Sequence, residues 1–346
     1  MKKRVTSRDV AEKAGVSRVT VSMILNRSSA ASFSDATRQR VIEAAEELGY
    51  RPNAAGRMLV RGNTETIGLV VCHAELLRYD GFIPQVLQAI AKVNQRHGYR
   101  VLLEVVEGNG TPDAYANMVD SRQIDGMIVI DPATDDPQLR ALIEEKFPLV
   151  LLGSVRHPKE HSVNFSTRRA VEMAVDHLVE LGHSNIGHIT YSPSGYVATD
   201  ARLNALRRAL EKHGLELDAG AVGYGAFSAE SGYEAMSDML ERSSNPPTAI
   251  LAGNDTIALG VMSAISARGL GVPDDIAVVG FDNLPISAFT NPSLTTINNP
   301  AIMQGTVAAE MLVKLLRRET VDQPRIRVEV DLIIRASSRG THFLPR

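Results

Sequence analysis

Cysteine and aromatic residues are scarce in this chain. Its 346 residues include one cysteine, Cys72, and no tryptophan, and aromatic residues make up only 5%. A single cysteine excludes an intramolecular disulfide framework and favours a reducing compartment. The longest apolar runs, such as IGLVV, are too short to span a membrane, and the first ten residues lack the apolar stretch of a signal peptide. We therefore expect a cytoplasmic protein with no membrane partner.

The signatures of metal binding and of catalysis are also missing. Nine histidines show neither an H-E-x-x-H motif nor a Cys/His spacing, and there is no G-x-S-x-G elbow or Walker A loop. The stretch GYGAFSAESG contains G-x-G but lacks the strand–helix context of a dinucleotide site. We expect no metal, no cofactor and no enzymatic activity.

Charge is unevenly distributed along the chain, although its formal net charge is only −3. Residues 1–62 hold 12 Lys/Arg against 6 Asp/Glu, whereas the remainder holds 25 against 34. A small basic head on a large acidic body indicates that the head meets a polyanion such as nucleic acid.

Three short helices are predicted in the basic head, residues 1–50. Thr6 with Asp9 forms a capping-box-like pair at the first helix, Gly15 suits the turn after it, and Ser17 and Ser34 are placed to cap the second and third. The side chains expected to face inward are Val10, Ala14, Val21, Ile24, Leu25, Val41, Ala45 and Leu48. The second helix also carries polar residues that this core does not need.

A linker follows the head at residues 51–65. Pro52 discourages a helix from running through Arg51, and the following eight residues allow only two helical turns, which are unstable alone in water. This segment reads as a conditional helix; a plain flexible tether is the alternative.

From residue 66 onward, apolar strand-like runs alternate with amphipathic helices. This pattern predicts an α/β body with parallel sheets covered on both faces, and its length predicts two lobes. Polar, glycine-containing segments follow the strands, where ligands of such sheets bind. The predicted divisions are a helix-turn-helix domain at 1–50, a linker at 51–65, and a body at 66–346 with an N-lobe of about 66–175 plus 300–326 and a C-lobe of about 176–299 plus 327–340.

Nearly the whole chain resembles the LacI/GalR family of transcription regulators. The most specific segments are DVAEKAGVSRVTVSMILN, RPNAAGRML, HLVELGHSNIGHI, PTAILAGNDTIALGVMSAISARGLGVPDDIAVVGFDN and PSLTTINNP. The resemblance implies a helix-turn-helix head, a body like that of periplasmic sugar-binding proteins (type I), a homodimer on double-stranded operator DNA, and a small-molecule effector in the cleft.

The resemblance makes the second helix of the head the reader of base edges in the major groove. Its expected contacts come from Ser17, Arg18, Val19, Ser22 and Met23, with Arg18 suited to a guanine. Family members more often carry a polar or basic residue where Met23 stands. The groups expected to position phosphates are Ser7, Arg8, Asn26 and Thr37.

The linker acquires a role from the same resemblance. In the family it becomes helical on the operator, and a leucine wedges into a base step of the minor groove; that residue is Leu59 here. Asn53, Gly56 and Arg57 belong to the same motif. Gly56 stands where alanine is common and makes the folded segment less stable.

The expected effector site draws on the body. Arg202 matches an R-x-x-G element whose glycine is Ala205 here, Asp282 suits paired hydroxyl groups, and Asn254 can donate and accept. Ser166 stands where many relatives carry a carboxylate, which puts a simple sugar in doubt. The remaining candidates are the aromatic residues Tyr79, Phe82 and Phe227, for which a core position is an equal alternative. Asp255 is expected to cap the helix after it.

We interpret the chain as a homodimeric DNA-binding repressor of metabolic genes, controlled by a sugar or related metabolite. A corepressor mechanism uses the same parts with the opposite sign. Two different classes of protein share parts of this pattern. One is a solute-binding protein without a DNA role, against which the basic head argues. The second is a two-lobed nucleotide-dependent dehydrogenase, against which the missing phosphate loop argues.

Overall fold

The computed structural model describes residues 5–25, 33–50, 63–106 and 113–339. The chain divides into two compact units, a head ending at Glu65 and a body beginning at Thr66, which is where the sequence predicts the body to start. Each unit is described by itself. Within the described residues, no helix combines the length and the apolarity that a membrane crossing requires.

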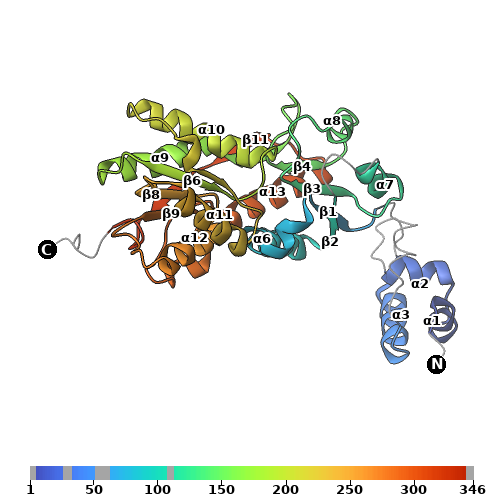
Figure 1. Cartoon of the computed structure of the whole chain (residues 1–346). Helices are drawn as coiled ribbons and strands as arrows, with labels where there is room; N and C mark the ends of the chain where they lie inside the picture. The colour runs from blue at the N-terminus through green and yellow to red at the C-terminus, as the bar shows by residue number, and fades with distance from the viewer. Residues whose placement is uncertain (1–4, 26–32, 51–62, 107–112, 340–346) are drawn as a thin grey trace. The chain divides into compact units, whose positions relative to one another are not determined.

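Three helices make up the described part of the head (Figure 1): α1 (Ser7–Ala14), α2 (Arg18–Leu25) and α3 (Asp35–Glu47). The Asp9 carboxylate accepts hydrogen bonds from the backbone N–H and the hydroxyl of Thr6, each at 2.7 Å, and Gly15 ends α1 in the left-handed region at φ 68°. The buried core is Val10, Ala11, Ala14, Val21, Ile24, Val41, Ala44 and Ala45. This core closely matches the predicted one, with Leu25 and Leu48 at its edge.

Two six-stranded sheets organise the body. The first has the order β11-β5-β4-β3-β1-β2 and is parallel throughout; the second has the order β12-β10-β9-β8-β6-β7 and is parallel except for the β10–β12 pair. The first sheet consists of β1 (Thr66–Val71), β2 (Arg100–Val105), β3 (Gly126–Ile130), β4 (Leu149–Leu152), β5 (Ser162–Phe165) and β11 (Arg325–Val328). The second consists of β6 (Ile186–Thr190), β7 (Val222–Tyr224), β8 (Ala249–Ala252), β9 (Ala277–Phe281), β10 (Thr295–Asn298) and β12 (Asp331–Ile333).

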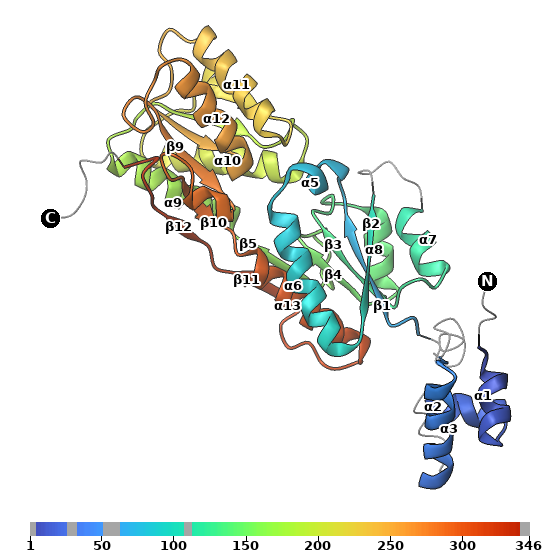
Figure 2. The ribbon, with the colours of Figure 1, turned by 90° about the horizontal axis from the view of Figure 1, so that it is seen from below.

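Helices cover both faces of each sheet, as Figure 2 shows. In the N-lobe, α6 (Phe82–His97) and α13 (Ala301–Leu316) pack on one face, and α7 (Ala114–Asp120) and α8 (Pro137–Glu144) on the other. In the C-lobe the corresponding pairs are α11 (Ala229–Arg242) with α12 (Asp255–Ala267), and α9 (Thr167–Glu180) with α10 (Val197–Lys212). A short helix, α5 (Ala74–Tyr79), follows β1. Burial on both faces explains why most strands read as continuous apolar runs.

The chain crosses between the lobes three times: between β5 and α9, between β10 and α13, and between β11 and β12. Helix α9 packs on α10 and on β12, so it belongs to the C-lobe. The first crossing therefore lies at residues 165–167, ahead of the predicted boundary near 175. The prediction was late because the strand before it, SVNF, is short and partly polar and gives no apolar signal.

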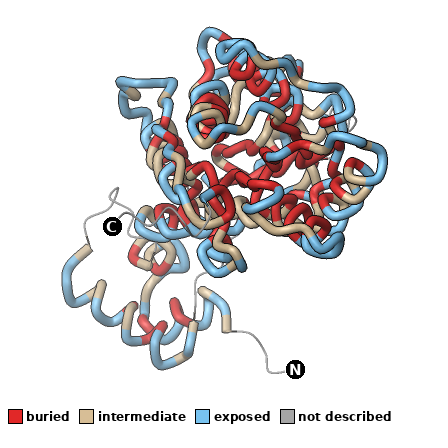
Figure 3. Tube along the Cα trace, turned by 60° about the vertical axis from the view of Figure 1, so that its left-hand side comes forward, coloured by how far each residue is buried: buried red, intermediate tan, exposed pale blue. Residues whose placement is uncertain are grey.

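Buried residues concentrate on the strands and on the helices that cover them (Figure 3). Helices α11 and α12 pack closely, and a glycine of each meets the backbone of the other. A Cβ on Gly260 would lie 1.8 Å from the carbonyl oxygen of Ala229, and one on Gly232 would lie 2.6 Å from that of Ile257. Only glycine permits these helices to pack at this separation, and the packing fixes the start of α12.

Candidate functional site: a reading helix and an interlobe cavity

Helix α2 presents a polar side away from the core of the head. Val21 and Ile24 are buried against α1 and α3, whereas Arg18 is exposed and Val19 is 62% exposed. Ser22 and Met23 are half-buried beside them. An exposed arginine in the first turn, next to an exposed aliphatic side chain, suits a guanine edge and a thymine methyl group.

Two of the residues predicted to contact DNA also hold the helices in place. The Ser17 hydroxyl accepts from the backbone N–H of Thr20 at 3.0 Å, and Ser34 accepts from that of Thr37 at 3.3 Å. The Ser34 and Thr37 hydroxyls also lie 2.9 Å apart. Ser17 is therefore an N-cap of the reading helix; its hydroxyl also lies 2.9 Å from that of Thr20, and when Thr20 is the donor the Ser17 proton is available to an outside acceptor.

Ser7 and Arg8 lie in the first turn of α1, where Arg8 is exposed and Ser7 half-buried. The other predicted DNA contacts, Asn26, Asn53, Gly56, Arg57 and Leu59, lie outside the described residues. For these five residues, the DNA-contacting role remains a prediction from the sequence.

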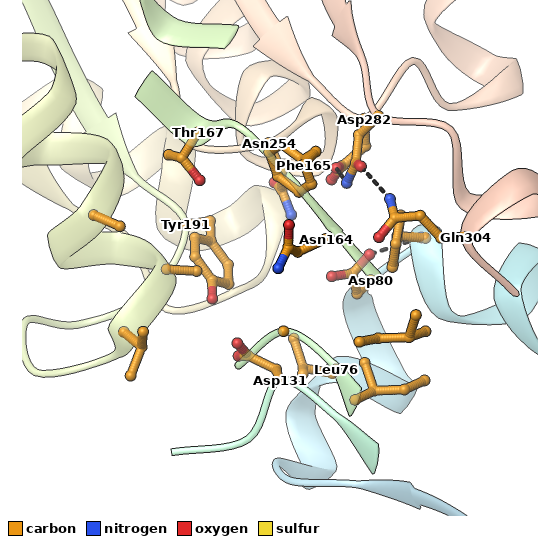
Figure 4. Close-up of a pocket in the computed structure, with 18 of the residues that line it drawn as sticks. Leu76, Asp80, Asp131, Asn164, Phe165, Thr167, Tyr191, Asn254, Asp282 and Gln304 are labelled. Atoms are coloured by element: carbon orange, nitrogen blue, oxygen red, sulfur yellow. Dashed lines mark hydrogen bonds between the residues drawn. The ribbon is translucent and has the colours of Figure 1, made fainter. Parts of the chain in front are cut away.

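A cavity of about 210 Å³ lies between the two lobes of the body, at the carboxyl ends of their strands (Figure 4). Asp131 follows β3, Asn254 follows β8, and Asp282 follows β9. The crossings also contribute: Asn164 and Phe165 end β5 and Thr167 begins α9 on either side of the first crossing, and Asn299 lies in the second. A molecule in this cavity therefore touches both lobes and two of the segments that join them.

Arg202 enters the cavity from α10 and is held from several sides. Its Nη1 donates to the carbonyl of Gly253, and its guanidinium carbon lies 4.0 Å from the centre of the Phe281 ring and 4.9 Å from that of Tyr191. Stacking on aromatic faces and a fixed hydrogen bond lock the orientation of the guanidinium. Arg202 is the only Lys or Arg in the cavity lining among the residues that the structure describes.

Three carboxyl groups share this cavity with one guanidinium. Burial first, and then the neighbouring Asp282, raise the pKa of Asp80 to about 7. Burial also raises the pKa of Asp131 and of Asp282, against the opposing effect of Arg202 on both groups and of His73 on Asp131. Two of the three adopt the left-handed region, at φ 56° for Asp131 and φ 103° for Asp282, a strained conformation that often marks functional sites.

Four of the seven predicted effector residues line the cavity, namely Phe82, Arg202, Asn254 and Asp282. Ser166 does not; its hydroxyl accepts from the backbone N–H of Arg169 at 3.2 Å and caps α9, while its neighbours Phe165 and Thr167 face the cavity. Ser166 therefore has a structural role as the N-cap of α9.

Tyr79 and Phe227 also stay out of the cavity lining. The backbone carbonyl of Tyr79 accepts from the Thr256 hydroxyl at 3.2 Å, a bond between the lobes. Phe227 is buried and meets Tyr191 and Tyr196 edge-on, with ring centres 5.7 and 5.3 Å apart. Phe227 is thus a core residue, which is one of the two alternatives that the sequence allowed, and it packs behind Tyr191.

The roles of Asn254 and Asp255 differ from those expected. Asn254 is the N-cap of α12, accepting from the backbone N–H of Ile257 at 2.9 Å, which leaves its amide nitrogen for the cavity. Asp255 instead accepts from the backbone N–H of Leu284 and from the hydroxyls of Ser287 and Thr296. The expectation that Asp255 caps the helix was wrong, because its carboxylate turns to the loop that carries Asp282.

Sequence reasoning missed several lining residues, chiefly Asp80, Asp131, Asn164 and Gln304. Asp131 follows a strand, so its place in the site could have been predicted, because ligands of parallel sheets bind at the carboxyl ends of the strands. Asp80 ends a short helix that no sequence pattern predicted, and Gln304 lies inside α13, where a polar residue reads as surface. A second cavity of about 300 Å³ adjoins the first and shares Asp131 and Val197 with it.

Comparison with known proteins gives this arrangement its class. Residues 6–53 match the family described as bacterial regulatory proteins, lacI family, and residues 175–338 match a periplasmic binding protein-like domain. The chain is 32% identical to the transcriptional regulator CelR of Thermobifida fusca, covering 97% of this chain and 99% of that one. It is 30% identical to catabolite control protein A of Priestia megaterium, with the same two coverages.

Solved structures agree with this result. A lac repressor dimer bound to operator and the anti-inducer ONPF superposes with a TM-score of 0.86 at 30% identity, over 97% of this chain and 99% of that one. A complex of CelR with cellobiose gives a TM-score of 0.71 at 31% identity, over 96% and 100%. The chain belongs to the LacI family: it is a DNA-binding transcriptional regulator with a helix-turn-helix head and an effector-binding body, and it is not an enzyme.

Proposed function

We propose that this regulator represses its target genes by binding a palindromic operator as a homodimer in the cytoplasm, and that a small polar effector in the interlobe cavity releases the DNA. The observation that carries this proposal is the construction of the cavity from both lobes and from two of the segments that connect them. A ligand with different contacts in two lobe orientations shifts the population between them.

The lining residues define the class of effector. Carboxylates and amides from Asp80, Asp131, Asn164, Asn254 and Asp282 offer hydrogen-bond partners for several hydroxyl groups, and Phe82 and Tyr191 offer apolar surface for a ring. This combination fits a sugar or a related hydroxylated metabolite. The same cavity also serves a corepressor. An inducer stabilises the lobe orientation that releases DNA, whereas a corepressor stabilises the orientation that binds it.

Self-association has a candidate surface in the C-lobe. Phe289 is 83% exposed and Ile286 is 49% exposed on the segment that follows Asp282. Apolar side chains exposed side by side on a folded protein mark interaction surfaces. We place part of the dimer interface at this surface. Sedimentation at micromolar concentration tests this placement, and Phe289→Ser is expected to weaken the dimer. A wild-type chain that is monomeric contradicts the proposed dimer.

The reading role of α2 is tested by a pair of arginine variants. Arg18→Ala is expected to lower the preference for the selected operator over a scrambled duplex by roughly 1–3 kcal/mol, because a bidentate guanine contact is lost. Arg40→Ala, which removes an exposed arginine from α3, is the matched control for charge. Fluorescence anisotropy at moderate salt measures both duplexes. Equal losses on the two duplexes for Arg18→Ala contradict the base-reading role.

A further inference from the structure

The described residues line the interlobe cavity with three carboxyl groups and one guanidinium. Asp80 comes from the end of α5, Asp131 from the end of β3 and Asp282 from the end of β9, so three separate elements aim a carboxyl group at one small volume. Figure 4 shows Asp80 and Asp131 on one side of the cavity and Asp282 on the other. Among the described residues, the lining holds no lysine or histidine and one arginine.

The arginine already uses part of its hydrogen-bonding capacity within the protein. Arg202 donates to the carbonyl of Gly253 and lies over the ring of Phe281. One guanidinium with part of its hydrogen-bonding capacity used does not balance three carboxyl groups. Burial raises the pKa of all three carboxyl groups, and the neighbouring Asp282 adds to this effect at Asp80; Arg202 lowers each pKa without offsetting burial.

The hydrogen bonds within the protein leave acceptors open. Oδ1 of Asp80 receives the backbone N–H of Phe82 at 2.7 Å, and Oδ1 of Asp282 receives the Asn299 side chain at 2.9 Å. From the part of the chain that the structure describes, Oδ2 of each receives no hydrogen bond, and neither oxygen of Asp131 does. A ligand that fits this cavity therefore has to bring donors.

We propose that the effector is a hydroxylated amine, whose protonated nitrogen lies among Asp80, Asp131 and Asp282 while its ring lies against Phe82 and Tyr191; amino sugars are the simplest members of this class. The inference rests on the effector-binding role proposed above and narrows it. An ammonium group supplies up to three donors and one positive charge, which are the two properties that the cavity lacks. A phosphate or carboxylate on the ligand adds to the negative charge and is disfavoured.

The test compares each amino sugar with its parent hexose, which carries a hydroxyl group in place of the amine. D-Glucosamine, D-galactosamine and D-mannosamine are titrated calorimetrically into the full-length protein at neutral pH, beside glucose, galactose and mannose, with glucose 6-phosphate as the anion. At least one amine is expected to bind about tenfold or more tightly than its parent hexose. The inference is overturned if no amine exceeds its parent hexose, including the case in which none of the compounds binds, or if the phosphate binds most tightly.

Variants locate the amine. Asp80→Asn is expected to bring the amine-to-hexose affinity ratio close to one, and Glu75→Gln, which removes an exposed carboxylate from the same helix α5, is expected to leave the ratio unchanged. Asp131→Asn serves as the second variant if Asp80→Asn fails to fold, as judged by circular dichroism. A ratio that survives in the folded variant overturns the assignment.

Operator selection by the wild-type protein without added compound is measured in parallel. Selective operator binding without amine preference defeats only this inference, whereas a failure to select any duplex defeats the proposed function itself.

Discussion

Replacing Gly260 with alanine tests the packing that positions the effector cavity. The new Cβ would lie 1.8 Å from the Ala229 carbonyl oxygen and 2.6 Å from the Tyr233 nitrogen, whereas ordinary contacts begin near 3.4 Å. Both neighbours are backbone atoms, so α11 and α12 have to move apart. Overpacking of this kind costs roughly 1–3 kcal/mol or more, and the better helix propensity of alanine returns about 1 kcal/mol.

We therefore expect Gly260→Ala to lower the free energy of unfolding by about 1–2 kcal/mol or more, and Tm by roughly 2–8 °C for a unit of this size. Since α12 begins with Asn254 and Asp255, effector affinity is expected to fall with stability. Gly305→Ala is a graded comparison, because its Cβ would lie 2.8 Å from the carbonyl oxygen of Val86.

Urea denaturation followed by circular dichroism measures each variant, with Ser263→Ala on the exposed side of α12 as the control. The reasoning is refuted if Gly260→Ala is as stable as the wild type, or if Gly305→Ala is the more damaging of the two.

Three further outcomes are expected. Asp282→Ala removes a buried carboxylate from the cavity and is expected to lower the affinity for the effector by roughly tenfold to a hundredfold, as measured by calorimetry. An unchanged affinity contradicts the effector-binding role of Asp282. The Asp80 pKa of about 7 lies above its unfolded value of about 3.9, so the contribution of Asp80 to stability is fully present below about pH 3.9 and is lost as pH rises through about 7. Asp80→Asn lacks this contribution, so urea denaturation should show the stability of the variant rising relative to the wild type between about pH 4 and 7 and then staying constant; a difference that does not change with pH contradicts the raised pKa. Leu59→Ala, at a position outside the described residues, is expected to reduce DNA bending, and an unaltered bend angle in gel-mobility assays contradicts the wedge.

Much of the fold was readable from the sequence because buried parallel strands are continuous apolar runs. IGLVV, MIVI and LVLL became β1, β3 and β4 without ambiguity. The edge strands β7, β11 and β12 were missed, since each is short, partly exposed and defined by its neighbour rather than by its own residues. Tertiary pairing decides such strands.

The site was only partly predictable for a related reason. Asp282 and Asn254 follow apolar strands, so their position at the ligand-binding edge could be inferred. Asp80 follows α5, a six-residue helix whose single buried side chain, Leu76, leaves no periodic pattern. Phe227 is turned into the core by its left-handed backbone at φ 69°, which a sequence pattern does not reveal.

Residues 325–333, close to the end of the described chain, add one border strand to each half of the body: β11 beside β5 and β12 beside β10. Premature termination just before this stretch would remove a strand from both halves at once. Neither half is encoded by one continuous portion of the gene, so fragments cut at a single point would leave unpaired backbone in both pieces. Domain dissection of this regulator consequently has to keep residues 66–339 together.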